Sequence, residues 1–263
     1  TYSISVPFTL DPNVVIIISV IGGIAVASLV TFQQLRKRAK VYREFRENSV
    51  MNKCNDLLNL NYIMVIDKKT GINVFEQYFS GKTFEPTLIS GFFEAIRQFG
   101  IELASSYEQS QTIKLEYQDS KIIMSEFKEF RLLLIMKDNP SKDLLEAIKQ
   151  LSYEIEENFG EKFKKFVGEV AQFQGIKDLI EKHLLISFIS PLTVKMREDV
   201  KLPPSERHLV KIAQEFMKEN SMDYFFTTFL IPGESCDYKT VDSIFNLINK
   251  DIFQQVSLEE NES

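Results

Sequence analysis

The hydrophobic pattern of the chain opens with a long uncharged run at residues 14–32, VVIIISVIGGIAVASLVTF. Its nineteen residues, at about 1.5 Å of rise each, nearly match the ~30 Å hydrocarbon core of a bilayer. A soluble helix of this length would show a polar face, and this run has none. The pattern therefore predicts a transmembrane helix over residues 14–35, after a short N-terminal segment at residues 1–13.

A cleaved signal peptide is the alternative, because Ala25, Val26 and Ala27 match the small-x-small cleavage pattern. A secretory signal carries basic residues before its apolar run, whereas here only Asp11 precedes the run. A basic cluster follows it instead: Arg36, Lys37, Arg38, Lys40, Arg43 and Arg46. The flanking charges therefore favour a single-pass anchor with its N-terminus outside and the bulk of the chain in the cytoplasm.

The charges of the chain divide unevenly at the end of this cluster. Residues 1–46 carry a net charge of +4, and since the whole chain carries −6, the remaining residues carry −10. The basic residues next to the membrane would attract anionic headgroups at roughly 1 kcal/mol each, or would only fix the topology. An acidic body is repelled by nucleic acid, so nucleic-acid binding is not expected.

Small residues recur along one face of the predicted span. Ser19, Gly23 and Ala27 lie four residues apart, a spacing that lets two membrane helices approach closely. A homodimer through this face is one interpretation. The other is that these residues reflect only the general abundance of small residues in membrane helices.

The next part of the chain predicts a stalk, a hairpin and a helix. Charged residues are frequent and apolar ones sparse in residues 36–60, which favours a basic juxtamembrane helix. Residues 62–66 (YIMVI) end in the turn sequence DKKTG, and residues 72–79 complete an antiparallel hairpin. Apolar residues at helical spacing then predict a helix over residues 88–103, with one flank on the sheet and the other facing a partner or another part of the chain.

Three more strands and a long helical stretch follow. Alternating or continuous apolar runs predict strands at residues 112–117, 121–124 and 130–136. Helical periodicity begins after Pro140, and Gly160 predicts a break between two helices. The order of the predicted strands and helices favours an α+β fold, in which a five-stranded antiparallel sheet has one helix on one face and further helices on the other.

Residues 186–263 are predicted to be mostly helical. Residues 205–220 and 240–253 have helical patterns, and residues 224–230 (YFFTTFL) fit a strand or a short buried helix. These elements could form a small domain resembling a winged helix. Acidic residues outnumber basic ones here, so a protein contact or a packing role is favoured over DNA binding.

The sequence contains no recognisable catalytic or metal-binding motif. With 2 Cys and 2 His, it excludes a disulfide-stapled miniprotein and a Cys/His-rich metal cluster. Residues 81–83 (GKT) resemble the end of a phosphate-binding loop, but Glu76 stands where that loop needs Gly. His183 and His208 lack metal-ligand spacing and are interpreted as surface or capping residues. We therefore expect no enzyme activity, no metal and no cofactor.

Four segments carry a resemblance to a known family: residues 61–79 (NYIMVIDKKTGINVFEQYF), 88–103 (LISGFFEAIRQFGIEL), 113–124 (IKLEYQDSKIIM) and 131–136 (RLLLIM). With their order, they make residues 61–185 similar to longin-like domains and the related roadblock group, a profilin-like fold, especially those of archaea that encode many small GTPases. The resemblance implies a non-enzymatic adaptor that binds proteins through a sheet edge or a helix–sheet groove. Longins of vesicle SNAREs mostly carry a C-terminal anchor after heptad repeats, so an N-terminal anchor argues against a role in fusion.

Together these features predict a membrane-anchored adaptor that recruits or regulates a small GTPase or a membrane-trafficking factor. The predicted contact is the groove between the helix at residues 88–103 and the strand at residues 112–117. Its candidate residues are Ile89, Phe93, Ile113 and Leu115, for which core packing is the other interpretation. A membrane-tethered sensor with a PAS-like ligand-binding domain is the alternative function, and a purely structural anchor is a third.

Overall fold

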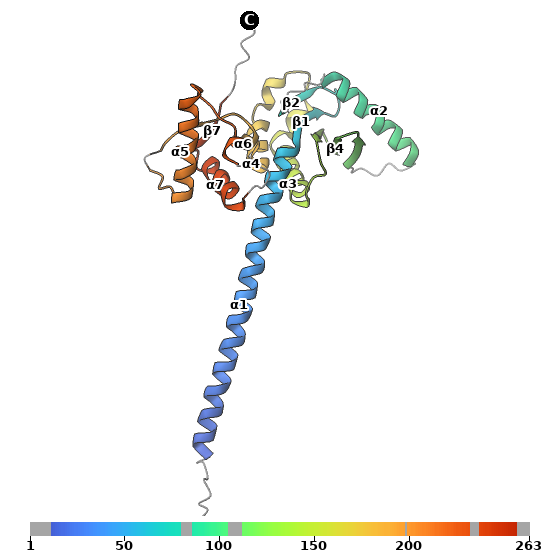
Figure 1. Ribbon diagram of the computed structural model, residues 1–263. Helices are drawn as coiled ribbons and strands as arrows, with labels where there is room; N and C mark the ends of the chain where they lie inside the picture. Colours follow the sequence, from blue (N-terminus) through green and yellow to red (C-terminus); the bar gives the residue numbers. More distant parts are fainter. Residues whose placement is uncertain (1–11, 80–85, 105–111, 198, 232–236, 257–263) are drawn as a thin grey trace, which may run out of the picture. The chain divides into compact units, whose positions relative to one another are not determined.

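The computed structural model describes residues 12–79, 86–104, 112–197, 199–231 and 237–256 (Figure 1). The chain divides into two compact units, Thr1–Asn48 and Ser49–Ser263. Within these helices and strands, only the backbone is described for residues 12–31, 86, 87, 90, 97, 100, 101, 103, 104, 112 and 117.

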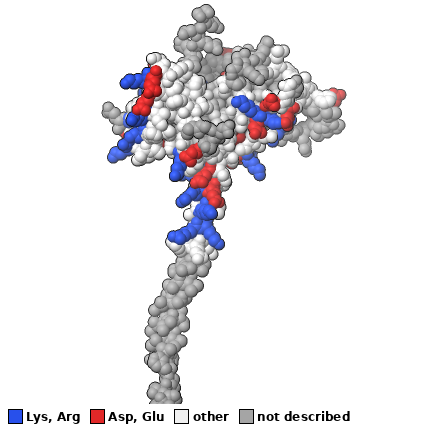
Figure 2. All heavy atoms as spheres, in the orientation of Figure 1, with Lys and Arg blue, Asp and Glu red and all other residues white. Residues whose placement is uncertain are grey.

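The first unit contains most of helix α1, which spans Pro12–Asn59. Its basic residues Arg36, Lys37, Arg38, Lys40 and Arg43 are exposed, and Lys and Arg side chains gather on this part of α1 in Figure 2. Among the residues whose side chains are described, no helix is both long and apolar enough to cross a membrane. Residues 14–31 of the predicted span at residues 14–35, including Ser19, Gly23 and Ala27, lie outside those residues, so the transmembrane helix stays a prediction.

The second unit is built on a five-stranded antiparallel sheet, as the sequence predicts. The strands lie in the order β2-β1-β5-β4-β3, so the first and last strands of the motif pair at the centre of the sheet. Their bounds are β1 Leu60–Asp67, β2 Asn73–Tyr78, β3 Thr112–Tyr117, β4 Ser120–Glu126 and β5 Phe130–Met136.

Local turn chemistry fixes two of the hairpins. Between β1 and β2, the buried carboxylate of Asp67 accepts hydrogen bonds from the backbone N–H and the hydroxyl of Thr70, at 2.7 and 2.6 Å. Gly71 follows with φ at 72°, a left-handed conformation that glycine adopts without strain. Between β3 and β4 the turn is only two residues long, and Gln118 takes the positive φ of 50°.

Helices cover both faces of the sheet. Helix α2, Pro86–Ala104, lies against one face, and the other belongs to a larger core that includes α3, Lys142–Lys164. Ser141 caps α3 by accepting a hydrogen bond from the backbone N–H of Leu144 at 3.1 Å. The predicted break at Gly160 is wrong, because α3 runs through it. The helix ends at Lys164, where the backbone N–H of the cap residue Lys165 donates to the carbonyl of Phe163.

The larger core extends from Cys54 in α1 to Phe253 near the end of the described chain, so the C-terminal elements share it with the sheet. Phe225 forms an isolated bridge with Leu192, which continues the small β6–β7 sheet by one residue. These elements are η1 Val170–Phe173, α4 Ile176–Leu184, η2 Ile186–Ile189, β6 Leu192–Val194, α5 Pro204–Glu219, α6 Thr227–Leu230, α7 Tyr238–Asn249 and β7 Phe253–Gln255.

Candidate protein-binding site on α2 and the sheet

Helix α2 is attached to the sheet by a small apolar cluster that is separate from the larger core. Phe93 is its anchor on the helix, with only 3% of its surface exposed. Ile89 packs beside it and is partly buried. Beneath the helix the cluster consists of Tyr62, Met64 and Ile66 of β1, Met124 of β4, and Leu133 and Ile135 of β5, with Tyr78, Ile113, Leu115 and Ile122 partly buried against it.

A hydrogen-bonded group of side chains closes one end of this cluster. The hydroxyl of Tyr62 donates to Glu76 Oε2 at 2.8 Å, and the hydroxyl of Tyr78 donates to the same oxygen at 3.4 Å. The two tyrosine rings lie 4.4 Å apart. Burial, helped by these hydrogen bonds, raises the pKa of Tyr62, so its hydroxyl stays a proton donor to the carboxylate.

An ion pair ties α2 to the sheet at the other end. Arg131 of β5 is 5% exposed, and its Nη2 lies 2.8 Å from Glu94 Oε2 of α2. Its Nε has no hydrogen-bond partner among the described residues. On the neighbouring strand, Glu126 pairs with Lys68 at 2.5 Å. The helix is therefore fixed by apolar packing in the middle and by charge at one end.

A second apolar stripe of α2 faces solvent. Leu88, Phe92 and Phe99 are 69%, 54% and 62% exposed, and their spacing of four and seven residues places them on one side of the helix. Phe92 lies next to Phe93, with ring centroids 5.4 Å apart, so the exposed stripe and the buried cluster are linked by ring contact. Packing on the sheet uses only one apolar side of a helix, so the second apolar side of α2 is left without a contact to the sheet.

Strand β3 forms one edge of the sheet, because it pairs with β4 alone. Ile113 and Leu115 point toward the side covered by α2 and are partly buried, whereas Lys114 and Glu116 are exposed. Glu116 forms an ion pair with Lys121 of β4. At the opposite edge, β2 lies against η1. The edge at β3 is thus the more accessible of the two within the described residues.

The structure brings all four predicted contact residues, Ile89, Phe93, Ile113 and Leu115, into one cluster. Packing against the sheet accounts for the burial of Phe93, and partner binding by the four stays a prediction. Sequence reasoning did not single out the exposed stripe of α2, Leu88, Phe92 and Phe99, as a contact surface. Both flanks are apolar, so hydrophobicity alone could not separate them.

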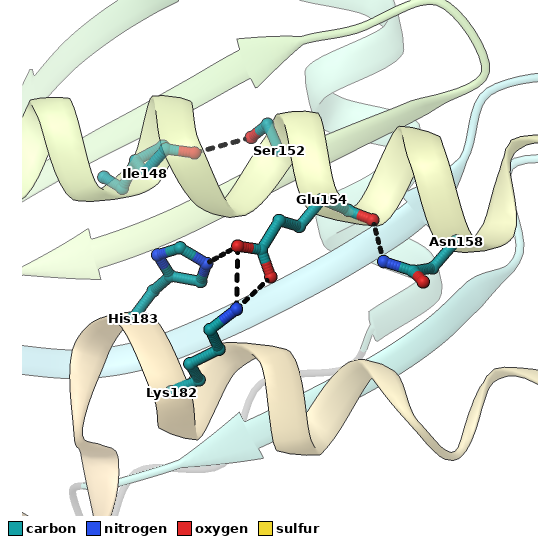
Figure 3. Close-up of polar contacts among 6 residues, drawn as sticks. All are labelled: Ile148, Ser152, Glu154, Asn158, Lys182 and His183. Carbon is teal, nitrogen blue, oxygen red and sulfur yellow. Dashed lines mark hydrogen bonds and ion pairs between the residues drawn. The ribbon is translucent and has the colours of Figure 1, made fainter.

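A group of polar contacts joins α3 and α4. Glu154 of α3 accepts hydrogen bonds from Lys182 Nζ of α4 at 2.9 and 2.8 Å, and His183 Nε2 lies 3.2 Å from it (Figure 3). His183, with its side chain only 15% exposed, therefore lies between α3 and α4. No group of residues with metal-ligand composition occurs in the part of the chain that the structure describes.

Two surface hollows lie away from α2. One is lined by residues of α5 and α6, and the other lies between α4 and the end of α7. No protein-family model matches the sequence, and no curated protein matches it. The function is therefore inferred from the residues themselves, among which α2 and β3 offer the surface best suited to a protein contact.

Proposed function

We propose that this chain is a membrane-anchored, non-enzymatic adaptor whose longin-like domain faces the cytoplasm and recruits a small GTPase or a membrane-trafficking factor. In this proposal residues 14–35 cross the bilayer and the basic residues from Arg36 onward fix the orientation. Binding, rather than turnover, is the activity of the protein.

The observation that carries the proposal is the solvent-facing stripe of α2. Leu88, Phe92 and Phe99 each expose more than half of their surface, on the order of 300–400 Å² together if a fully exposed side chain presents roughly 200 Å². The largest apolar patch on a soluble monomer typically measures about 300–600 Å² and is often functional. The charged residues of α2 are Glu94, Arg97 and Glu102, a net of −1, which favours a protein partner over an anionic membrane surface.

The order of elements supports the longin-like part of the proposal. Two strands, one helix, three strands and then helices follow each other as the resemblance implies. A single helix, α2, lies between β2 and β3 in the described chain, and β3 is an edge strand of the sheet. In this proposal the contact combines the stripe of α2 with the edge of β3.

The test is a binding assay between residues 49–263, a compact unit with its own apolar core, and each small GTPase encoded with the protein. Each GTPase is loaded with GDP or with a non-hydrolysable GTP analogue. The informative variant is Phe92→Asp, which places a charge in the exposed stripe. Tyr153→Asp, at a 59% exposed position of α3, is the matched control.

We expect at least one GTPase to bind in a nucleotide-dependent manner, with an affinity that falls about tenfold or more in Phe92→Asp and stays unchanged in Tyr153→Asp. Circular dichroism establishes that both variants keep the fold. If no GTPase binds in either nucleotide state, or if Phe92→Asp binds as well as the unchanged protein, the proposal is wrong for this surface.

A further inference from the structure

The free edge of β3 carries two exposed charges of opposite sign. On one side β3 pairs with β4, and no strand of the described chain pairs with it on the other side. The backbone N–H and C=O groups of a free edge can accept a further strand. Lys114 and Glu116 are both exposed, and because they are two residues apart they lie on the same face of the strand. A further strand at this edge would therefore meet a lysine and a glutamate side by side.

The two faces of β3 differ in character. Ile113 and Leu115 belong to the apolar cluster on the α2 side of the sheet, so Lys114 and Glu116 lie on the opposite face. A strand that joins this edge continues both faces only if its own apolar residues also lie on the α2 side. A shift of one residue would place its charged residues on the apolar face instead.

A second copy of β3 meets this condition in one antiparallel register. Two copies related by a two-fold axis perpendicular to the sheet pair antiparallel, and each face continues across the junction when the axis passes through a residue. With the axis at Leu115, this residue lies opposite its own copy, and Lys114 of each copy lies opposite Glu116 of the other.

The neighbouring registers are unfavourable. With the axis at Lys114 or at Glu116, that residue lies opposite its own copy, so two like charges meet directly across the junction. An axis nearer either end of β3 leaves most of the strand unpaired. The pattern of β3 is therefore complementary to itself in the register centred on Leu115, in its charges as well as in its apolar face.

We propose that this chain forms a homodimer in which β3 pairs antiparallel with β3 of a second copy, in the register centred on Leu115. The pairing joins two five-stranded sheets, satisfies the free backbone groups of both edges and places two Lys114–Glu116 pairs between the copies. Because the paired segment is short, we expect a dissociation constant in roughly the micromolar range.

This inference rests on β3 alone and holds with or without a GTPase. In the proposed function the partner contacts the same edge, so a partner and a second copy would compete for it. The test below contains only this chain, and its outcome is therefore separate from that of the GTPase assay.

Sedimentation equilibrium of residues 49–263 over a wide range of protein concentrations measures the dissociation constant. Lys114→Glu and Glu116→Lys each place like charges opposite one another at both pairs, and each should weaken the dimer about tenfold or more. Lys149→Glu makes the first of these charge changes at an exposed position of α3 and should leave the dissociation constant unchanged. Circular dichroism establishes that the variants keep the fold.

A mixture of the two edge variants provides the decisive measurement. In a mixed dimer the acidic side chains at positions 114 and 116 of one variant lie opposite the basic side chains at positions 116 and 114 of the other. We therefore expect the mixture to associate about as tightly as the unchanged protein, although each variant alone does so weakly. Sedimentation of a fluorescently labelled Lys114→Glu protein with unlabelled Glu116→Lys protein reports this association.

Three results would overturn the proposal. The first is an unchanged protein that stays monomeric at the highest concentration. The second is a dimer that Lys114→Glu and Lys149→Glu affect equally, because the contact would then lie away from β3. The third is a mixture that associates no better than the separate variants, because the register centred on Leu115 would then be wrong.

Discussion

Arg131 of β5 lies beneath α2 with its Nη2 2.8 Å from Glu94 Oε2, and this pair is a charged link between the helix and the sheet. The two partners are unequal: the side chain of Arg131 is 6% exposed, whereas that of Glu94 is 40% exposed. Loss of Glu94 would leave a buried charge without its carboxylate, while loss of Arg131 would leave a carboxylate that water can solvate.

This asymmetry predicts the order of stability among three variants. Glu94→Ala should lower the free energy of unfolding by about 1–3 kcal/mol, and Arg131→Met by less, because Met removes the buried charge and keeps apolar volume. The double variant should be at least as stable as Glu94→Ala alone. Urea unfolding of residues 49–263, followed by circular dichroism, measures all three. A larger loss in Arg131→Met than in Glu94→Ala would contradict the assignment of Arg131 as the costly buried partner.

Adjacent phenylalanines of α2 provide a second prediction. Phe93→Ala should lower the free energy of unfolding by about 3 kcal/mol, because Phe93 is 3% exposed and anchors the helix to the sheet. Phe92→Ala, at a 54% exposed position, should change it by only about 0.5 kcal/mol. Because the two changes remove the same side chain from the same helix, helix propensity cancels between them. Similar losses in the two variants would show that the exposed stripe is instead packed.

The strands were predictable because local turn sequences separate β1 from β2 and β3 from β4. Strands β3 and β5 have the bounds that the sequence indicates, and the turn that carries Gly71 separates β1 from β2 as expected. Gly160 misled the helix prediction, since a single glycine inside an apolar stripe is tolerated when tertiary packing holds the helix. The helix ends at Lys164, with Lys165 as its C-cap.

The orientation of α2 on the sheet was less predictable than the helix itself. Both flanks of α2 are apolar, so the flank that faces the sheet depends on the rotation of the helix about its axis, which no local pattern specifies. The aromatic hollow of α5 and α6 is also a tertiary feature. Its strongest sequence signal is the aromatic density of residues 224–229, which equally suits a buried strand.

The contact between α3 and α4 predicts a pH dependence. Hydrogen bonding from Lys182, with a smaller effect of His183, lowers the pKa of Glu154 in the folded protein. The stability that this carboxylate contributes is therefore present above its ordinary pKa and is lost as the pH falls through the lowered value. Glu154→Gln should be less stable than the unchanged protein at pH 7, and this difference should shrink below about pH 4.

The matched control for this prediction is Glu157→Gln, which changes an exposed carboxylate on the same helix. Thermal unfolding of both variants and the unchanged protein between pH 3 and pH 7 is the measurement. If the stability difference between Glu154→Gln and the unchanged protein does not vary with pH, the hydrogen bonds of Glu154 do not depend on its carboxylate charge.

The buried carboxylate of Asp56 predicts a contribution to stability that changes with pH in the opposite direction. It accepts hydrogen bonds from the backbone N–H and the hydroxyl of Ser141, at 2.9 and 2.5 Å, and so supports the residue that caps α3. Burial raises the pKa of Asp56, and the bonds from Ser141 only partly oppose this rise. For an acid whose pKa is raised on folding, the associated stability is present below the ordinary pKa and is lost as the pH rises through the folded value.

Asp56→Asn removes this titration and retains a side-chain oxygen that can accept from the Ser141 backbone. The stability of the unchanged protein relative to Asp56→Asn should therefore decrease as the pH rises from about 4 toward 7. Ser141→Ala should cost about 1 kcal/mol through loss of the helix cap and should steepen the decrease, because it removes a hydrogen bond that favours the ionised carboxylate. Urea midpoints at several pH values report both effects. A relative stability that rises with pH would mean that the Ser141 bonds, rather than burial, dominate the ionisation of Asp56.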